Sequence, residues 1–408
     1  MRHGDAEDDF GLGQRHHDRR DGGPADHLRI SLSPSATAAL LWAACRPTID
    51  RELVDDALAR GADLARAALI AREQRVSPLL LRALDGPGVD GPWRADLHAD
   101  AARCRARAAL VLPALAELGI RPLVDAGFEP VVMKGASIVG RYPAPGLRPM
   151  DDVDVVVARR DLDAAVQVLR DEGWELYPVP GGAHHETAMA HPRVADLPIE
   201  VHSSFAILRT RSNRLRSDEM WRRRVPLDVC GVGAFRFADA DEIVFLAAHA
   251  AKPFHVFDRL LWSVDVAVVV EAAARSGSAV DWDQVAAFSQ AGGCRSAVAV
   301  ALAQAARLGA SVPAALCSSP ASRFRRALLE PLFSADWPVL ERHDDDRSRW
   351  QYALMDDPRF WVVLLTQEGR VRSPSEAART AVSLSRRWLR LHRAREHRVE
   401  DARDRVEP

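Results

Sequence analysis

The sequence predicts an α+β protein in which a small mixed β-sheet is embedded in a mostly helical chain. Apolar residues recur at helical spacing in both the N-terminal and the C-terminal part. Between these parts, residues 119–237 hold short Val-rich runs that alternate with helical segments, as in a small α/β core. With 408 residues, 48% of them hydrophobic and 27% charged, the chain is long enough for about two or three domains.

The N-terminal part divides into a tail and a helical region. Residues 1–28 are mostly Asp, Arg, His and Gly, too polar to offset the entropy lost on ordering, and are expected to be disordered. Residues 29–118 are expected to be helical, because Ala and Leu dominate and β-branched residues are few. The helical spacing is clearest in Ala39–Ala44, Glu52–Arg60, Leu64–Arg72 and Ala101–Leu118, the last of which is expected to end before Gly119.

Residues 119–237 are predicted to form the core that contains the sheet. A helix over Asp161–Glu172 is expected to end at Gly173, and a loop rich in Gly and His is expected before the last strand. The expected strands are Phe128–Met133, Asp152–Val157, Trp174–Val179 and Leu197–Val201.

Residues 238–395 are predicted to form a helical C-terminal domain, and residues 396–408 a charged tail. Gly or Pro breaks separate segments that carry apolar stripes. The expected helices are Asp239–Lys252, Phe257–Arg275, Asp281–Gln290, Arg295–Leu308 and a strongly basic one, Ser373–Arg395.

The overall charge and the cysteines exclude several classes of protein. Lys plus Arg number 55 against 57 for Asp plus Glu, so the net charge of −2 gives no general attraction for nucleic acid or a membrane surface. The apolar stretches fall short of the ~20 residues of a membrane span. Five widely spaced cysteines without a Cys-x-x-Cys pair support neither a disulfide framework nor a zinc site. A polar start without a signal-peptide pattern leads us to expect a cytoplasmic protein.

The strongest chemical signal is the Asp-x-Asp pair that opens the second expected strand. Residues two apart on a strand point to the same face, so Asp152 and Asp154 should project together while the following valines fill the core. Two carboxylates on one face repel each other unless a cation lies between them, and Mg²⁺ is the cation that such oxygens favour. The alternative is a strand whose polar ends are simply solvated.

A third carboxylate, Glu200, lies in another short apolar run. If its strand lies beside that of Asp152 and Asp154, the three carboxylates form a cluster. Such a cluster can hold two metal ions about 4 Å apart and clamp the attacking and leaving oxygens of an in-line phosphoryl transfer.

A candidate phosphate-binding turn follows the first strand. Gly135 lets the backbone approach a phosphate, the next helical turn offers free N–H groups, and Ser137 adds a hydroxyl. Lys134 supplies a compact ammonium, one of only two lysines among the 55 basic residues. An ordinary strand-to-helix turn is the alternative, and the spacing of a Walker loop is missing.

These pieces follow one another in an order that resembles a known family. The succession comprises Val131–Ala136, Tyr142, Arg148–Val157 and Ile199–His202. Over roughly Leu110 to Asp265 it resembles the uncharacterised nucleotidyltransferase family of the DNA polymerase β-like nucleotidyltransferase superfamily. The superfamily's Gly-Gly or Gly-Ser turn is replaced here by Gly135 followed by Ala136.

The resemblance implies a core sheet with helices, Mg²⁺, and transfer of a nucleotidyl group from a nucleoside triphosphate to an acceptor hydroxyl. ATP is the expected donor, and the acceptor is not identified. By position, Asp152, Asp154 and Glu200 would bind the metal, and Glu200 is also a candidate base. The positions that match the family's phosphate-binding segment are Gly135, Ser137 and Arg148.

Three further residues are candidates for the wall of the pocket. His202 should share a strand face with Glu200. His249 and Lys252 are three apart on one expected helix and so are neighbours, with Lys252 a candidate contact for the triphosphate. An interhelical polar network is the alternative for this pair. His184-His185-Glu186 lies in the Gly-rich loop and is expected to be solvated rather than to bind a metal.

Three functions therefore remain open at the level of the sequence. The first is a Mg²⁺-dependent nucleotidyltransferase, and the second is a nucleotide-binding or scaffold protein that kept the fold without the chemistry. A carboxylate of Glu200 more than about 8 Å from the Asp pair would favour the second, because one metal could not link them. The third is a helical interaction protein with a purely structural α/β insert, which predicts no binding of nucleotide or metal.

Overall fold

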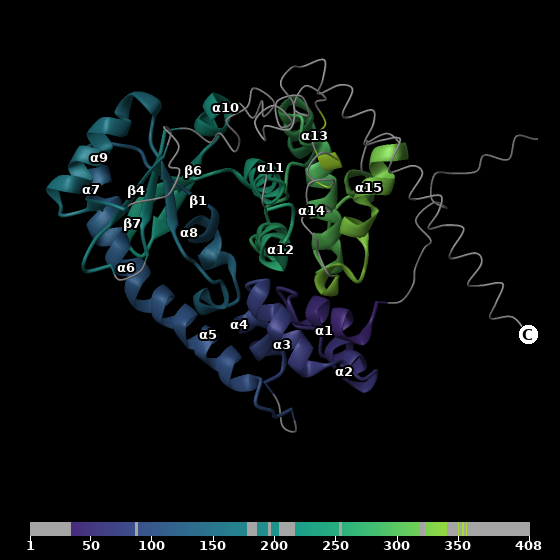
Figure 1. Ribbon diagram of the computed structural model, residues 1–408. Coiled ribbons are helices and arrows are strands. Elements are labelled where there is room, and N and C mark those ends of the chain that lie inside the picture. The colour runs from purple at the N-terminus through teal and green to yellow at the C-terminus, as the bar shows by residue number, and fades with distance from the viewer. Residues whose placement is uncertain are drawn as a thin grey trace, which may run out of the picture. The chain divides into compact units, whose positions relative to one another are not determined.

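The computed structural model describes residues 34–85, 89–177, 186–194, 197–203, 217–252, 255–318, 323–340, 350, 353–354 and 356. From Pro34 onward these residues belong to one compact unit (Figure 1). The expected tails, 1–28 and 396–408, and the basic helix Ser373–Arg395 lie outside the described residues.

The described chain begins with a group of packed helices. Aspartate side chains cap two of them, because Asp50 and Asp63 accept hydrogen bonds from the first backbone N–H groups of α2 and α3. The helices are α1 (Ala36–Ala44), α2 (Arg51–Ala59), α3 (Leu64–Glu73), α4 (Ser77–Ala83) and α5 (Arg94–Ala106).

The expected helix end before Gly119 is wrong. From α5 the helical backbone continues through α6 (Leu112–Leu115) to α7 (Arg121–Asp125), with π-helical segments at Arg107–Val111 and Ala116–Ile120. Gly119 is buried, and a Cβ there would meet the Trp174 ring at 3.1 Å and Ile199 at 3.2 Å. This glycine therefore allows close packing against the sheet region instead of ending the helix.

A mixed sheet of seven strands lies at the centre, in the order β3-β4-β5-β2-β1-β7-β6. β1 pairs with β7 and β2 with β5 in parallel, whereas the remaining pairs are antiparallel. The strands are β1 (Val131–Met133), β2 (Val153–Val156), β3 (Glu175–Leu176), β4 (Glu186–Ala190), β5 (Ile199–His202), β6 (Val225–Val229) and β7 (Val232–Arg236). The α+β class expected from the sequence is confirmed.

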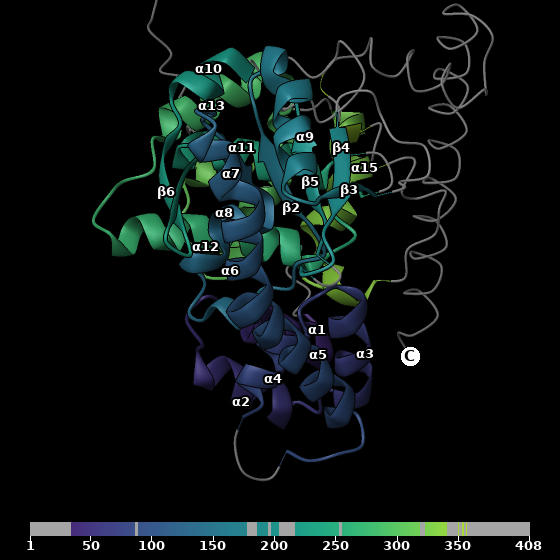
Figure 2. The same cartoon turned by 90° about the vertical axis from the view of Figure 1, so that its left-hand side faces the viewer.

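The two faces of the sheet pack against different helices. Val132, Val153 and Val155 belong to the core formed with α6, α7 and α9 (Leu162–Asp171), which Figure 2 shows on the viewer's side of the sheet. Val131 and Val156 point the other way, into a larger core shared with the N-terminal and C-terminal helices. This alternation of side chains along each strand determines which polar residues face which layer.

Three strands were not expected from the sequence. β4 begins at Glu186, inside the expected Gly- and His-rich loop, and its pairing with β5 makes it part of the sheet. β6 and β7 form a hairpin whose turn residues Cys230 and Gly231 both have positive φ, at 54° and 87°. Such a two-residue turn between apolar runs is a hairpin signal, so this pair was recognisable in the sequence.

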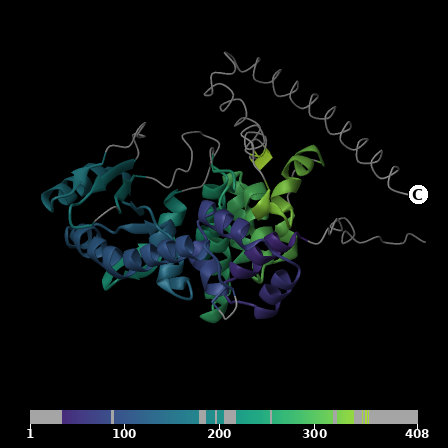
Figure 3. The same cartoon turned by 60° about the horizontal axis from the view of Figure 1, so that its bottom comes forward.

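The C-terminal helices pack on the N-terminal ones (Figure 3). Buried Gln74 joins the two groups, since it accepts from the backbone N–H of Leu260 and donates to the carbonyl of Pro338. The remaining helices are α8 (Lys134–Ile138), α10 (Ser217–Arg222), α11 (Asp239–Ala250), α12 (Leu260–Arg275), α13 (Trp282–Gly292), α14 (Arg295–Arg307) and α15 (Arg323–Phe333). Short 3₁₀ turns occur at Val139–Arg141, Pro145–Leu147, Arg159–Asp161, Ala314–Cys317 and Trp337–Val339. Within the described part of the chain, every helix is too short or too polar to cross a membrane.

Candidate active site

The polar side chains predicted to act together come from two adjacent strands. β2 and β5 run in parallel, with Asp154 opposite Glu200 and Val156 opposite His202. Because the intervening valines fill the core on the side of α9, these polar side chains lie on the sheet face toward the C-terminal helices. The register thus brings Asp154, Glu200 and His202 together.

Asp154 is the centre of this cluster. Its side chain is 1% exposed, and Oδ1 accepts from Lys134 Nζ at 2.5 Å and lies 2.9 Å from His202 Nε2. The same His202 nitrogen is 3.5 Å from Glu200 Oε2. Asp152, directly before β2, is close enough for its charge to interact with Asp154, Lys134 and Glu200.

The charges in the cluster shift one another's ionisation. Burial would raise the pKa of Asp154, but the ammonium of Lys134 and the bond from His202 hold it well below its usual value. Burial would lower the pKa of Lys134, but Asp154 and Asp152 raise it. Burial would likewise lower the pKa of His202, which its bonds to Asp154 and Glu200 raise to about 9. At Asp152, burial together with the charge of Asp154 raises the pKa to about 6, although the charge of Lys134 lowers it.

The backbone at Lys134 is held in an uncommon conformation. Its φ of 51° lies in the left-handed region that residues with a side chain seldom adopt, at the junction of β1 and α8. Together with the contact between Nζ and Asp154, this geometry turns the lysine side chain back over the sheet.

The donor atoms suit a divalent metal. Among the described residues, Asp154, Glu200 and His202 form a group whose ligand atoms all lie within 4.8 Å of one another. Asp152, also predicted as a ligand, is not part of this group. Carboxylates suit Mg²⁺ and Mn²⁺, and a histidine ligand must lose its proton before it can coordinate, so metal binding here would release a proton.

The structure gives Arg148 a different set of partners from the phosphates expected for it. Its guanidinium donates to both carboxylate oxygens of Asp265 on α12, at 3.0 and 2.8 Å, and both side chains are buried. Tyr142 donates to the same carboxylate at 2.6 Å. Arg148 therefore ties the loop before β2 to the C-terminal helices, and a role in phosphate binding stays a prediction.

Gly135 is required by the position of that arginine. A Cβ at Gly135 would lie 2.3 Å from Arg148 Nη1 and 3.1 Å from the Cγ atom of Met150. The glycine expected at a phosphate turn thus provides the room in which the guanidinium packs against α8.

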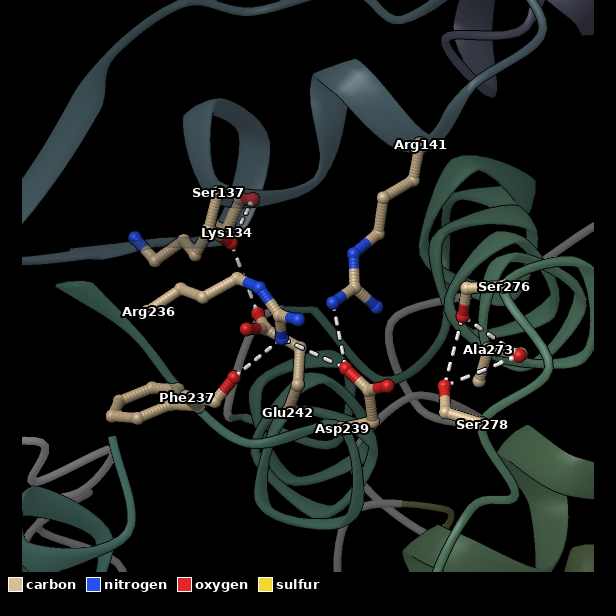
Figure 4. Close-up of polar contacts among 10 residues, drawn as sticks. All are labelled: Lys134, Ser137, Arg141, Arg236, Phe237, Asp239, Glu242, Ala273, Ser276 and Ser278. Carbon is tan, nitrogen blue, oxygen red and sulfur yellow. Dashed lines mark hydrogen bonds and ion pairs between the residues drawn. The ribbon is translucent and has the colours of Figure 1, made fainter. Parts of the chain in front are cut away.

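Ser137 faces a buried carboxyl group rather than open space (Figure 4). Its hydroxyl lies 2.8 Å from the carbonyl oxygen of Lys134 and donates to Glu242 Oε1 on α11 at 3.1 Å. Glu242 is fully buried, its Oε2 has no partner among the described residues, and burial raises its pKa to about 7 although Arg141 and Arg236 lower it. Both arginines are bonded to Asp239 instead, at 2.6 and 2.7 Å.

The Glu242→Gln variant is expected to gain more stability at pH 8 than at pH 5. The carboxyl has an ordinary pKa of 4.5 in the unfolded chain and about 7 in the folded protein. Below pH ~4.5 both states hold the proton, but as the pH rises the unfolded chain ionises first, and the parent loses up to about 3 kcal/mol of stability. Glutamine stays neutral at all these values.

Urea unfolding of the two proteins between pH 5 and pH 8 measures this difference. An exposed carboxylate changed in the same way, Glu172→Gln, is the control and should show no such trend. A constant difference between Glu242→Gln and the parent at all pH values would contradict the effect of burial.

His249 lies on α11, among aromatic side chains. It is buried, and its ring packs against His255 and Trp262 with centroids 4.8 and 5.9 Å away. Burial lowers its pKa well below the ordinary value, and the charges of Lys252, Lys134 and, to a smaller extent, Arg148 add to this effect. A role for His249 and Lys252 in the wall of the pocket stays a prediction. His184 and His185 lie outside the described residues.

The sequence did not predict that Ser137 pairs with Glu242 or that Arg148 pairs with Asp265. Glu242 beside Ser137 and Asp265 beside Arg148 each lie on a helix far along the chain. A charged residue in the middle of an otherwise apolar helical run was their only local signal, because such a residue needs a buried partner.

A comparison with known proteins identifies the family of the chain. Residues 60–310 match the family described as "Uncharacterised nucleotidyltransferase". Among curated proteins, none matches the chain. The matched region contains both strands of the cluster, the Lys-Gly turn and helices α11 and α12. The chain belongs to the uncharacterised nucleotidyltransferase family.

Proposed function

We propose that this protein is a Mg²⁺-dependent nucleotidyltransferase that moves a nucleoside monophosphate from a nucleoside triphosphate, with ATP as the first candidate, to an acceptor hydroxyl. The observation that supports this most strongly is the register of β2 and β5, which sets Glu200 beside Asp154. Together with Asp152, these residues supply three carboxylates on adjacent strands at the junction with the helices.

In the proposed reaction the acceptor oxygen attacks the α-phosphorus, the bond to the bridging oxygen breaks, and pyrophosphate leaves with the electron pair. When bound, Mg²⁺ would neutralise the charge that develops on the phosphoryl oxygens. Asp152, Asp154 and Glu200 would hold the metal. Glu200 is the candidate that accepts the hydroxyl proton, because its side chain is 24% exposed, more than that of Asp154 or His202. Lys134 and Lys252 would stabilise the negative charge of the triphosphate.

The alternative is a nucleotide-binding protein that has lost the chemistry. A Glu200 carboxylate far from the Asp pair would favour this alternative. In the structure a Glu200 carboxylate oxygen lies within 4.8 Å of the ligand atoms of Asp154 and His202. The closeness of these groups therefore supports an active nucleotidyltransferase over a nucleotide-binding protein without catalytic activity.

Titration calorimetry of the four nucleoside triphosphates, with and without Mg²⁺, tests the proposal. We expect one of them to bind in a metal-dependent way to the parent and not to the Asp152→Asn/Asp154→Asn variant, because that variant loses two of three metal carboxylates. Absence of metal-dependent binding to the folded parent for all four would overturn the proposed function. If the folded double variant bound the triphosphate as tightly as the parent, Asp152 and Asp154 would not be part of the nucleotide site.

A further inference from the structure

A second polar site lies next to the candidate active site, between the N-terminal helices and the loop before β2. It is a cavity of about 270 Å³ whose wall includes Arg72, Arg75, Arg103, Arg107, Asp100 and Pro149. The arginines come from α3, the turn after it, α5 and the π-helical segment that follows α5. Four guanidinium groups from separate turns thus converge on one concave surface.

The cavity shares a short stretch of chain with the carboxylate cluster. Pro149 lines it, and Asp151 accepts from Arg75 and lies 3.1 Å from Arg107 Nη1. The next residue, Asp152, directly precedes β2, the strand that carries Asp154. The short segment Pro149–Asp152 therefore connects the cavity wall with the start of β2.

The cavity has more positive than negative charge. Its wall carries four guanidinium groups against one carboxylate, that of Asp100. Even when Asp96, 2.6 Å from Arg72, and Asp151 are added, one positive charge remains in excess. The four arginine side chains are 29% to 66% exposed, so their ion pairs are weak enough for a bound anion to replace them.

The backbone at Arg75 is a further sign that this side chain is needed where it is. Arg75 has a φ of 63° at the end of α3, a position that glycine usually takes because its lack of a Cβ avoids strain. An arginine is less stable than glycine in this backbone conformation. Its side chain lies at the cavity and beside Asp151.

We infer that this cavity binds a phosphate group of the acceptor substrate. Arginine forks match the oxygens of a phosphate in pairs, and a phosphate dianion suits a wall with excess positive charge. The inference rests on the proposed function for the identity of the reaction. It adds that the acceptor is a phosphorylated molecule whose phosphate is held at the arginine cavity and whose hydroxyl reaches the carboxylate cluster.

The test begins with inorganic phosphate, titrated into the metal-free full-length protein at constant ionic strength. Arg75→Gly is the main variant, because glycine is the preferred residue at this backbone conformation and the protein should fold with little change in melting temperature. Phosphate should bind the parent and bind Arg75→Gly about tenfold or more weakly, since a charge-assisted hydrogen bond is lost. Arg103→Gln, at an exposed position, should weaken binding in the same direction. Arg66→Gln removes one exposed guanidinium elsewhere on α3 and should bind like the parent.

A second arm separates the acceptor from the donor and the inference from the proposed function. A non-hydrolysable nucleoside triphosphate with Mg²⁺ should bind Arg75→Gly as tightly as the parent. A loss there equal to the loss of phosphate affinity would assign the cavity to the donor and overturn the inference. The inference would also be overturned if phosphate bound Arg75→Gly as tightly as Arg66→Gln, or if phosphate did not bind the parent, while the parent still bound nucleotide in a metal-dependent way. If the proposed function is wrong, the result is different, because the parent protein then binds no complex of Mg²⁺ and nucleotide.

Discussion

Asp152→Asn is expected to abolish metal-dependent nucleotidyl transfer while the protein stays at least as stable as the parent. Burial and the charge of Asp154 raise the pKa of Asp152 to about 6, so its carboxylate is poorly accommodated without a metal. A neutral side chain of the same size removes this repulsion. The loss of a metal carboxylate should lower turnover by about 10³-fold, since a bound metal supplies several kcal/mol to the transition state.

Turnover with the nucleoside triphosphate that binds in the calorimetric titration and a phosphorylated acceptor measures the first effect. Thermal unfolding of the same samples measures the second. Asp125→Asn, which changes an exposed aspartate on α7, is the control and should alter neither. An Asp152→Asn protein that is folded and keeps its activity would remove Asp152 from the catalytic group.

Asp154→Asn should differ, because it costs stability as well as activity. The ammonium of Lys134, whose side chain is 16% exposed, would lose the buried carboxylate 2.5 Å away, and breaking a buried pair costs up to about 3–5 kcal/mol. The added change Lys134→Met removes the orphaned charge, so the double variant should regain much of the stability and none of the activity. If activity returned with stability, Asp154 would be a structural residue.

The second large effect is expected at Arg148. Arg148→Met leaves the carboxylate of Asp265 buried with only the Tyr142 hydroxyl as a described partner, and should cost about 3–5 kcal/mol in the free energy of unfolding. The loop before β2 would also lose its attachment to α12. Urea unfolding at pH 7 measures this loss.

A double variant distinguishes the buried ion pair from a phosphate contact. Arg148→Met combined with Asp265→Asn removes both charges and should recover most of the lost stability, whereas each single change is costly. If Arg148 instead binds phosphate, Arg148→Met would keep its stability and lose nucleotide affinity. That outcome would contradict the structural role.

Several features of the fold follow from local patterns in the sequence. The buried valine runs at Val131–Met133 and Val153–Val156 become strands, and the apolar stripes after Ala238 become α11 to α14. Alternation along a strand places Glu200 and His202 on one face whatever the rest of the fold does. The order of the pieces also leads to the correct family, because the match to residues 60–310 depends on the sequence alone.

Other features depend on contacts between distant segments. Gly119 lies within the helical backbone at a place where the Trp174 ring leaves little room for a side chain, and the sequence has no local sign of that contact. Arg148 and Ser137 point to Asp265 and Glu242 because α11 and α12 pack on their side of the sheet. The sequence also did not determine which strand lies beside β2, and the structure shows that it is β5.

The arginine cavity shows the difference most clearly. With 53 arginines in the chain, no local pattern distinguishes the four that line the cavity, and arginine on a helix is ordinarily a solvated residue. The sequence by itself determined the strands that carry the site residues, the alternation of polar and apolar side chains along them, and the family. Only the tertiary structure decided which charged groups meet, because burial and charge pairing depend on the packing of segments that lie far apart in the chain.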